Sequence, residues 1–322
     1  MTPPAQRSGA QARALPVCTD DFADALLAGL RAHPKSIPCK YFYDAEGSRL
    51  FEQICALPEY YPTRTEFSLL RAHAQEIAAL AGPDAEIMEF GAGAGEKIRT
   101  LLDALDHPRA YIPVDISESY LTGVTARLRT DYPWLAIHPL MADFASELSW
   151  PVTTGLRRVG FFPGSTIGNF APQEARKFLS NTAKLLKGGG LLIGVDLVKD
   201  PGVLHAAYND SAGVTAAFNR NLLARANREA GANFARARFA HYAFYNPVER
   251  RIEMYLVSTA PQRVTVCGRV IPFAEGEAIH TEYSYKYTVA GFRELAASAG
   301  FVPRAVWSDP ECLFSIHWLE SP

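Results

Sequence analysis

The stretch E-F-G-A-G-A-G-E-K (89–97) decides the fold of this chain, because it joins a predicted strand to a predicted helix. The strand is the run I-M-E-F (87–90), and the helix is expected to begin near Glu96. Glycines at such a junction let the backbone turn tightly and come close to a ligand. Taken alone, a glycine-rich loop of this kind is weak evidence for a nucleotide-like ligand.

Four further apolar strands follow this loop and alternate with helices. The strands are predicted at 110–115, 136–141, 158–162 and 191–196, with helices over about 120–129 and 172–187. A last helix and two short strands are predicted at about 290–299, 302–307 and 313–319. Apolar strands that alternate with amphipathic helices predict an α/β fold with a parallel, doubly wound sheet and helices on both of its faces.

The pattern differs on both sides of this region. Residues 1–17 resemble a loose tail, and Thr63 with Glu66 has the spacing of a capping box at a helix start. After Pro201, residues 203–230 look helical and residues 240–288 alternate as antiparallel strands do. These segments break the strand–helix rhythm, so they predict a second unit.

We therefore predict a Rossmann-like domain and a second, discontinuous α+β lobe. The domain comprises residues 65–200 and 287–322, and the lobe comprises residues 1–64 and 201–286. We expect the lobe to cover the C-terminal edge of the sheet, where open α/β sheets bind their ligands.

Composition excludes several classes of function. The 322 residues are 48% hydrophobic and 20% charged, as in ordinary globular proteins, and the net charge of -2 comes without a lysine- or arginine-rich run. A nucleic-acid or membrane partner therefore has no electrostatic support. The five cysteines are odd in number and widely spaced, and no run of about 18 apolar residues occurs, so a cytoplasmic protein is expected. The eight histidines lack metal-ligand spacing, so no metal is expected.

Two details of the glycine loop favour S-adenosylmethionine over a dinucleotide. The spacing is G-x-G-x-G rather than G-x-G-x-x-G, and Glu89 stands before the first glycine, Gly91. A diphosphate favours an uncluttered helix N-terminus, whereas an acidic residue suits the cationic methionine half of S-adenosylmethionine. Asp115, at the end of the second strand, is placed to accept hydrogen bonds from the ribose hydroxyls. Asp143 and Phe144, after the third strand, can hold the adenine.

Longer motifs, spread nearly from end to end, are far more specific than the glycine loop. They are F-Y-D-A-E-G-S-R-L-F-E (42–52), L-P-E-Y-Y-P-T-R-T-E (57–66), E-F-G-A-G-A-G-E-K (89–97), G-S-T-I-G-N (164–169), D-L-V-K-D-P (196–201), A-Y-N-D-S-A-G-V-T-A-A-F-N-R-N (207–221), R-I-E-M (251–254) and T-E-Y-S (281–284). On these motifs the sequence resembles the histidine-specific N-α-methyltransferases of ergothioneine biosynthesis.

The resemblance implies a class I methyltransferase sheet and a monomeric enzyme that methylates the α-nitrogen of free histidine three times, giving hercynine. It also implies a site between the domain and the lobe. Tyr43 and Asn169 are implied near the substrate amine, with Asn169 and Tyr208 at its carboxylate. The residues implied around the imidazole are Tyr60, Met254, Glu282 and Ser284, with Tyr60 favoured over Tyr61. The implied cofactor set is Gly91, Lys97, Asp115, Asp143 and Phe144.

These roles make chemical sense. Methyl transfer is an in-line displacement that needs a neutral amine, so neutral acceptors such as Tyr43 and Asn169 can orient the nitrogen without stabilising its protonated form. Glu282 and Ser284 stand two apart in a predicted strand and share a face, so they could bind both nitrogens of an imidazole. The alternation around them also fits a solvated strand face, and Met254 and the tyrosines also fit an ordinary core.

Three rival functions remain on the sequence. A related enzyme could methylate an aromatic amino acid or a tryptophan derivative, although Glu282 argues against an apolar acceptor. A nucleotide-dependent oxidoreductase would share the sheet, but Glu89 and the glycine spacing argue against it. A non-catalytic protein that binds S-adenosylmethionine would bind the cofactor without turnover.

Overall fold

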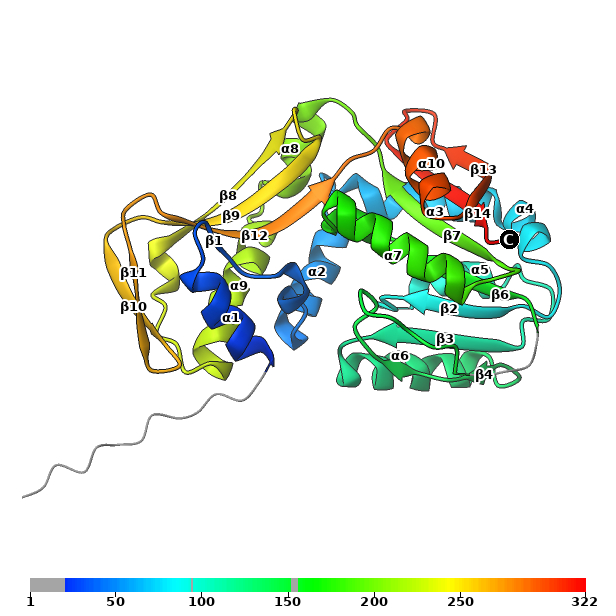
Figure 1. Ribbon diagram of the computed structural model, residues 1–322, viewed down its shortest axis with the longest axis horizontal. Coiled ribbons are helices and arrows are strands. Elements are labelled where there is room, and N and C mark those ends of the chain that lie inside the picture. Colours follow the sequence, from blue (N-terminus) through cyan, green and yellow to red (C-terminus); the bar gives the residue numbers. More distant parts are fainter. Residues whose placement is uncertain (1–20, 94, 152–155) are drawn as a thin grey trace, which may run out of the picture.

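The elements of the protein form two groups, each arranged around its own sheet (Figure 1). The computed structural model describes residues 21–93, 95–151 and 156–322. The tail expected at 1–17 lies outside these described residues. None of the described helices is both long and apolar enough to cross a bilayer.

The larger sheet has eight strands among the described residues, in the order β13-β14-β7-β6-β2-β3-β4, with β5 beside β3. Its parallel strands are β2 (Glu86–Phe90), β3 (Ala110–Asp115), β4 (Ala136–Ile137), β5 (Leu140–Met141), β6 (Arg158–Phe162) and β7 (Gly190–Asp196). Two antiparallel strands complete it, β14 (Phe314–Glu320) beside β7 and β13 (Val302–Ser308) beside β14. The strand order reverses between β2 and β6, and open α/β sheets bind ligands beyond the carboxyl ends of the strands at such a point.

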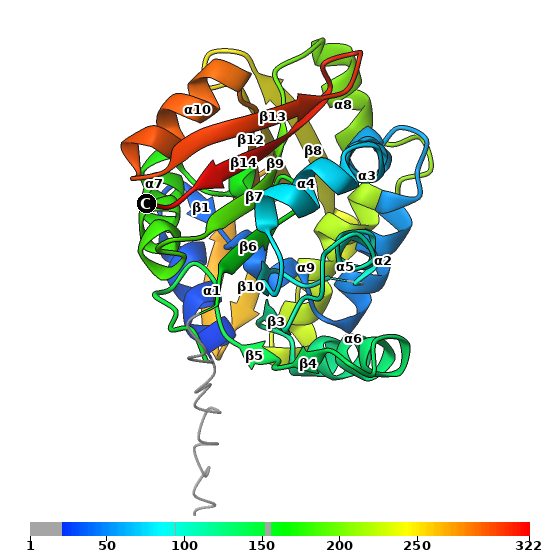
Figure 2. The same ribbon diagram turned by 90° about the vertical axis from the view of Figure 1, so that its right-hand side faces the viewer.

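Helices cover both faces of this sheet, and Figure 2 shows them on its two sides. One layer holds α3 (Tyr61–Ala72), α4 (Ala74–Ala81), α5 (Glu96–Leu102) and α6 (Glu118–Asp131), and the other holds α7 (Pro172–Leu185) and α10 (Val289–Ser298). Alternate strand residues serve the two layers: Ile87 and Tyr111 pack in the first core, and Met88 and Ile112 in the second. The predicted doubly wound α/β fold is therefore confirmed. The strand expected at 136–141 is in fact two short strands.

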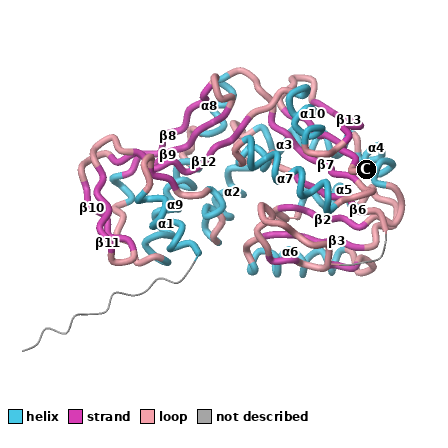
Figure 3. Tube along the Cα trace, in the orientation of Figure 1, coloured by secondary structure: helices cyan, strands magenta, loops and turns pink. Residues whose placement is uncertain are grey.

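The second group is built on a four-stranded sheet in the order β1-β12-β9-β8, of which Figure 3 labels β8, β9 and β12. Its strands are β1 (Lys35–Ser36), β12 (Ala278–Tyr285), β9 (Arg251–Ser258) and β8 (Phe239–Asn246), and β10 (Gln262–Val266) with β11 (Arg269–Phe273) forms a separate hairpin. Lys35 is the partner of Ile279, so the first strand of the chain joins the sheet formed after residue 200. Its helices are α1 (Asp21–Arg31), α2 (Ala45–Cys55), α8 (Pro201–Tyr208) and α9 (Val214–Glu229). The single helical stretch expected at 203–230 is thus interrupted between α8 and α9.

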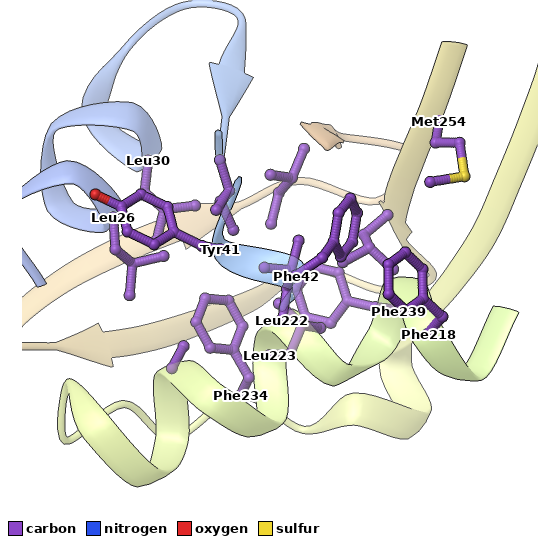
Figure 4. Close-up of a cluster of buried hydrophobic side chains, with 14 of the residues drawn as sticks. Leu26, Leu30, Tyr41, Phe42, Phe218, Leu222, Leu223, Phe234, Phe239 and Met254 are labelled. Carbon is purple, nitrogen blue, oxygen red and sulfur yellow. The ribbon is translucent and has the colours of Figure 1, made fainter. Parts of the chain in front are cut away.

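The core of this group draws on both parts of the chain (Figure 4). Phe42 stacks on Phe218 with ring centroids 4.5 Å apart, and Leu26 and Leu222 are fully buried beside them. Met254 of β9 is 1% exposed in the same core. Residues before 62 and after 203 therefore bury their apolar side chains together.

The predicted capping box at Thr63 and Glu66 is wrong. Helix α3 begins at Tyr61, and its N-cap residue Tyr60 makes no capping hydrogen bond. The Glu66 carboxylate, 1% exposed, instead accepts from the Gly164 amide at 2.9 Å and pairs with a lysine on α5. The partners of this carboxylate therefore come from a distant loop and a neighbouring helix rather than from its own helix end.

Candidate active site

The glycine loop is fixed to the carboxyl end of β3. The Gly91 amide donates to the Val114 carbonyl at 2.8 Å, and Gly91 has a φ of 76°. Gly95 has a φ of 74°, and a Cβ there would lie 2.9 Å from Val124 on α6. Both positions therefore require glycine, and the loop stays close to the end of the strand that carries Asp115.

Three predicted cofactor residues come together around this loop. Asp115 is the last residue of β3. Burial raises the pKa of its carboxyl, and hydrogen bonds from backbone amides, including that of Gly93, offset part of this rise. A Cβ on Gly91 would lie 3.4 Å from Cε1 of Phe144, so the Phe144 ring lies next to the loop. The Phe144 ring packs edge-on against the ring of Phe162, with the two ring centroids 5.5 Å apart.

Asp143 and Lys97, also predicted, are each held by an ion pair. Asp143 accepts from the Ala145 amide at 2.9 Å and pairs with Lys40 at 2.9 Å. Lys97 on α5 pairs with the buried Glu66. Lys40 is a residue that the sequence analysis missed, and it connects the 3-10 helix η1 (Cys39–Phe42) to the cofactor side of the protein.

Asn169 is positioned by close packing between a turn and β12. It ends the 3-10 helix η2 (Thr166–Asn169), which follows β6. A Cβ on the preceding Gly168 would lie only 2.8 Å from the Tyr285 carbonyl oxygen, so η2 packs directly on the β12 backbone. The half-buried Asn169 side chain makes no hydrogen bond within the described residues.

Three of the predicted tyrosines interact electrostatically with the same carboxylate, that of Glu282. Tyr43 follows η1, Tyr60 precedes α3 and Tyr208 ends α8. Burial raises the pKa of all three phenols, and the charge of Glu282 raises each further. These side chains, from distant parts of the chain, therefore lie close to Glu282 and stay neutral phenols at physiological pH.

Glu282 and Ser284 occupy the buried face of β12. Glu282 is 8% exposed and makes no hydrogen bond within the described residues, and burial raises the pKa of its carboxyl to about 7. Met254 is its partner on β9. Ser284 Oγ accepts from the Tyr208 hydroxyl at 2.8 Å and from Lys286 at 2.7 Å. The alternative interpretation of this strand face as solvated is wrong.

The two adjacent tyrosines at the start of α3 have different surroundings. The Tyr61 hydroxyl donates to Asp196 at 2.7 Å and accepts from Lys199 at 2.7 Å, and the side chain is 2% exposed. Tyr60 is half-buried, and its ring lies 6.3 Å from that of Phe51. Tyr61 is thus engaged in an ion network, while Tyr60 lies among the tyrosines near Glu282.

The sequence matches a known protein family over almost its whole length. The model of the S-adenosylmethionine-dependent, histidine-specific methyltransferases matches residues 22–321. This chain belongs to that family. It is 45% identical to a histidine N-α-methyltransferase of Mycolicibacterium smegmatis, over 91% of this chain and 94% of the relative.

Two more distant relatives have other names. Ergothioneine biosynthesis protein 1 of Neurospora crassa is 31% identical over 85% of this chain, which spans 32% of that longer protein. A 4-dimethylallyltryptophan N-methyltransferase of Epichloe festucae var. lolii is 26% identical over 94% of this chain and 95% of its own length.

The glycine-loop region of this methyltransferase fits the family's cofactor. S-adenosylmethionine, when bound, supplies a methyl group on a positively charged sulfur. The Phe144 ring, which lies next to Gly91 in this loop, offers a flat apolar surface. Asp115 has no cation partner among the described residues, so its carboxylate is available to hydroxyl donors.

The methyltransferase also contains a buried ion cluster that the sequence analysis missed. Asp196, at the end of β7, pairs with Lys286 at 2.7 Å and with Lys199 at 2.6 Å, and the Asp196 side chain is 1% exposed. One sequence signal was present. Lys286 stands two residues after Ser284, as Ser284 stands after Glu282, so the buried face of β12 continues into this lysine.

Proposed function

We propose that this methyltransferase transfers methyl groups from S-adenosylmethionine to the α-amino nitrogen of free L-histidine. The product is the trimethylated betaine hercynine, a step of ergothioneine biosynthesis. The observation that carries the proposal is Glu282, a buried carboxylate without a protein hydrogen-bond partner among the described residues, beside Ser284. The name of the M. smegmatis relative supports the same substrate.

Glu282 and Ser284 recognise the imidazole, between Tyr60 and Met254. The carboxylate accepts from one ring N–H, and the serine hydroxyl binds the other nitrogen. A phenylalanine or leucine substrate would leave these groups unpaired, at a cost of about 1–3 kcal/mol for each buried group. The same argument disfavours the dimethylallyltryptophan acceptor of the Epichloe relative.

Tyr43 and Asn169 orient the amine. A free α-amino group has a pKa of about 8, so little help is needed to obtain the neutral nucleophile. Burial and the Glu282 charge keep Tyr43 neutral, so its oxygen accepts a hydrogen bond without providing a negative charge that would retain the proton. Asn169 and Tyr208 together hold the carboxylate.

The cofactor lies on the other side of the amine, against the parallel sheet. Asp115 accepts from the ribose hydroxyls, Asp143 and Phe144 hold the adenine, and Gly91 leaves room for the backbone to approach. Lys97 completes this set from α5. Of the described residues, those within 1–64 and 201–286, which form the smaller sheet and its helices, make up the substrate lobe, and those within 65–200 and 287–322 make up the cofactor domain.

The enzyme acts as a cytoplasmic monomer. All proposed site residues come from one chain, so a second copy is not needed to complete the site. The described cysteines Cys39, Cys55, Cys267 and Cys312 form no disulfide with one another, as is usual in a reducing compartment. Light scattering of the purified enzyme tests the monomer, and a mass near 35.3 kDa is the expected result.

The number of methyl groups is tested by counting S-adenosylhomocysteine. We expect about three equivalents to be released for each histidine consumed, with mono- and dimethylhistidine as transient species in mass spectra. Release of one equivalent, with monomethylhistidine as the end product, would contradict trimethylation. Cofactor binding without any product from histidine would contradict the proposed substrate.

A further inference from the structure

Lys286 is buried at the junction between the two ends of the proposed substrate site. Its side chain is 1% exposed, and its ammonium donates to Ser284 Oγ at 2.7 Å and to the Tyr208 hydroxyl oxygen at 3.2 Å. Its third partner is Asp196, at 2.7 Å. An ammonium has three N–H donors, so these contacts use all of them.

The contacts of Lys286 determine whether the hydroxyl groups of Tyr208 and Ser284 can donate their hydrogens to a ligand. The Tyr208 hydroxyl has a single hydrogen, which it donates to Ser284 in the protein without ligand. When a substrate carboxylate takes that hydrogen, Ser284 loses one donor. Lys286 continues to donate to both oxygens, so neither is left without a partner, and both hydroxyl hydrogens can turn toward the ligand.

Asp196 fixes the ammonium in place and keeps it charged. Burial opposes the charge of Lys286, but Asp196 and Tyr208 together hold the pKa of the lysine above its ordinary value. Lys199 pairs with the other oxygen of the same carboxylate, at 2.6 Å, but no described contact joins Lys199 to Tyr208 or Ser284. Two ammonium groups therefore share one aspartate, and only Lys286 faces the proposed site.

We propose that Lys286 is a positioning residue for the amino-acid substrate. Its charge polarises Tyr208 toward the substrate carboxylate, and its hydrogen bond directs Ser284 toward the ring. The inference rests on the proposed function, because it assigns the carboxylate end of histidine to Tyr208. It extends that function by making selection for a free carboxylate depend on a lysine that does not touch the substrate.

The test compares Lys286→Met with Lys199→Met, which removes the other ammonium from the same aspartate. The readout is the ratio of kcat/KM for histidine to kcat/KM for histidinamide, in which the carboxylate is replaced by a neutral amide. We expect Lys286→Met to lower this ratio about tenfold or more, since a nearby charge then no longer favours the anion. Lys199→Met should keep the ratio within about twofold, and the dissociation constant of S-adenosylmethionine should change little in either variant.

A merely structural role for Lys286 gives a different result. In that case the two variants lose activity toward both substrates in proportion and the ratio stays constant, which would overturn the proposal. An equal fall of the ratio in both variants would also overturn it, because the effect would then come from Asp196. Failure of the unmodified enzyme to methylate histidine would refute the proposed function instead, so the two failures are distinguishable.

Lys286→Met leaves Asp196 without one of its partners and could fold poorly for that reason. A second pair of variants tests the proposal in that case. Asp196→Asn/Lys286→Met and Asp196→Asn/Lys199→Met each remove the buried carboxylate charge together with one lysine. The same ratio decides between them. A lower ratio in the first double variant alone supports the proposal, and equal ratios contradict it.

Discussion

Burial controls the acid–base chemistry of the side chains in the candidate site. The carboxyl of Glu282 is removed from water, which raises its pKa to about 7, and the phenol of Tyr43 is kept neutral by the same burial and by the nearby carboxylate. In contrast, the pKa of Asp196 is lowered despite burial, because Lys286 and Lys199 pair with it. The two lysines therefore keep Asp196 ionised, whereas the carboxyl of Glu282 has a pKa of about 7.

Replacing Glu282 by alanine tests the proposed ring contact. We expect kcat/KM for histidine to fall about 100-fold, because the ring N–H loses its buried acceptor, and we expect the affinity for S-adenosylmethionine to stay nearly unchanged. Steady-state kinetics and calorimetric titration measure the two quantities. An equal loss of both would indicate a folding defect and remove Glu282 from the substrate site.

The raised pKa of Glu282 also predicts a pH dependence of stability. The folded protein holds this proton up to a pH of about 7, whereas the ordinary carboxyl pKa is 4.5. The folded state binds the proton more tightly, so this group makes the protein progressively less stable as the pH rises from about 4.5 through 7, by up to about 3 kcal/mol. Glu282→Gln removes the titration, so urea unfolding of the ligand-free variant should lack this decline. Parallel curves for the two proteins would contradict the burial argument.

Asp115 is the corresponding test on the cofactor side. Asp115→Ala removes the only acceptor proposed for the ribose hydroxyls, so the dissociation constant of S-adenosylmethionine should rise about 10- to 100-fold. The KM for histidine at saturating cofactor should change little. Unchanged cofactor affinity would show that Asp115 lies outside the cofactor site.

Close packing of short elements determines where the site residues point. The 3-10 helix η2 carries Asn169 against β12, which carries Ser284, and Gly168 is the point of contact. This contact has no room for a methyl group. The relative position of η2 and β12 therefore depends on residue 168 being a glycine, which has no side chain.

Replacing Gly168 by alanine tests this contact. The new methyl group would meet the β12 backbone, so we expect a loss of about 1–3 kcal/mol of stability and a lower kcat/KM for histidine. The matched control is Gly123→Ala on the exposed surface of α6, where nothing lies within 4 Å of the added Cβ. That variant should be slightly more stable and fully active. Equal behaviour of the two variants would refute the packing argument.

At the scale of the whole molecule, the two groups of elements meet at a buried ion cluster. The parallel sheet contributes Asp196 from the end of β7, and the segment after β12 contributes Lys286. Tyr61, at the start of α3, donates to the same carboxylate at 2.7 Å. The cluster therefore joins elements of both groups at the place where the substrate is expected.

Removing Asp196 tests how strongly this cluster joins the molecule. Asp196→Ala leaves two buried ammonium groups without a counter-charge. We therefore expect the free energy of unfolding, measured in urea, to be about 3–5 kcal/mol lower than that of the unmodified protein. The control is Glu46→Ala, which removes the partner of the exposed Arg49 and should leave the free energy of unfolding nearly unchanged. Similar small losses in the two variants would show that the cluster does not stabilise the fold.

Local sequence patterns predicted the parallel sheet because apolar periodicity belongs to each strand and helix on its own. Asp115 and Phe144 could be found in the same way, as residues that follow strands. Contacts between distant residues could not. The Glu66 carboxylate accepts a hydrogen bond from the amide of Gly164, 98 positions away. The local spacing of Thr63 and Glu66 instead predicted that Glu66 caps its own helix. Lys286 and Asp196 were missed because no local pattern shows that a lysine and an aspartate of different elements are buried together.

The most direct test of the proposed substrate is a competition among acceptors. The purified enzyme is incubated with S-adenosylmethionine and an equimolar mixture of the twenty amino acids, and the products are identified by mass spectrometry. We expect histidine alone to be converted, and to its trimethyl form. Methylation of another amino acid in preference to histidine would contradict the assignment of Glu282 and Ser284 to an imidazole.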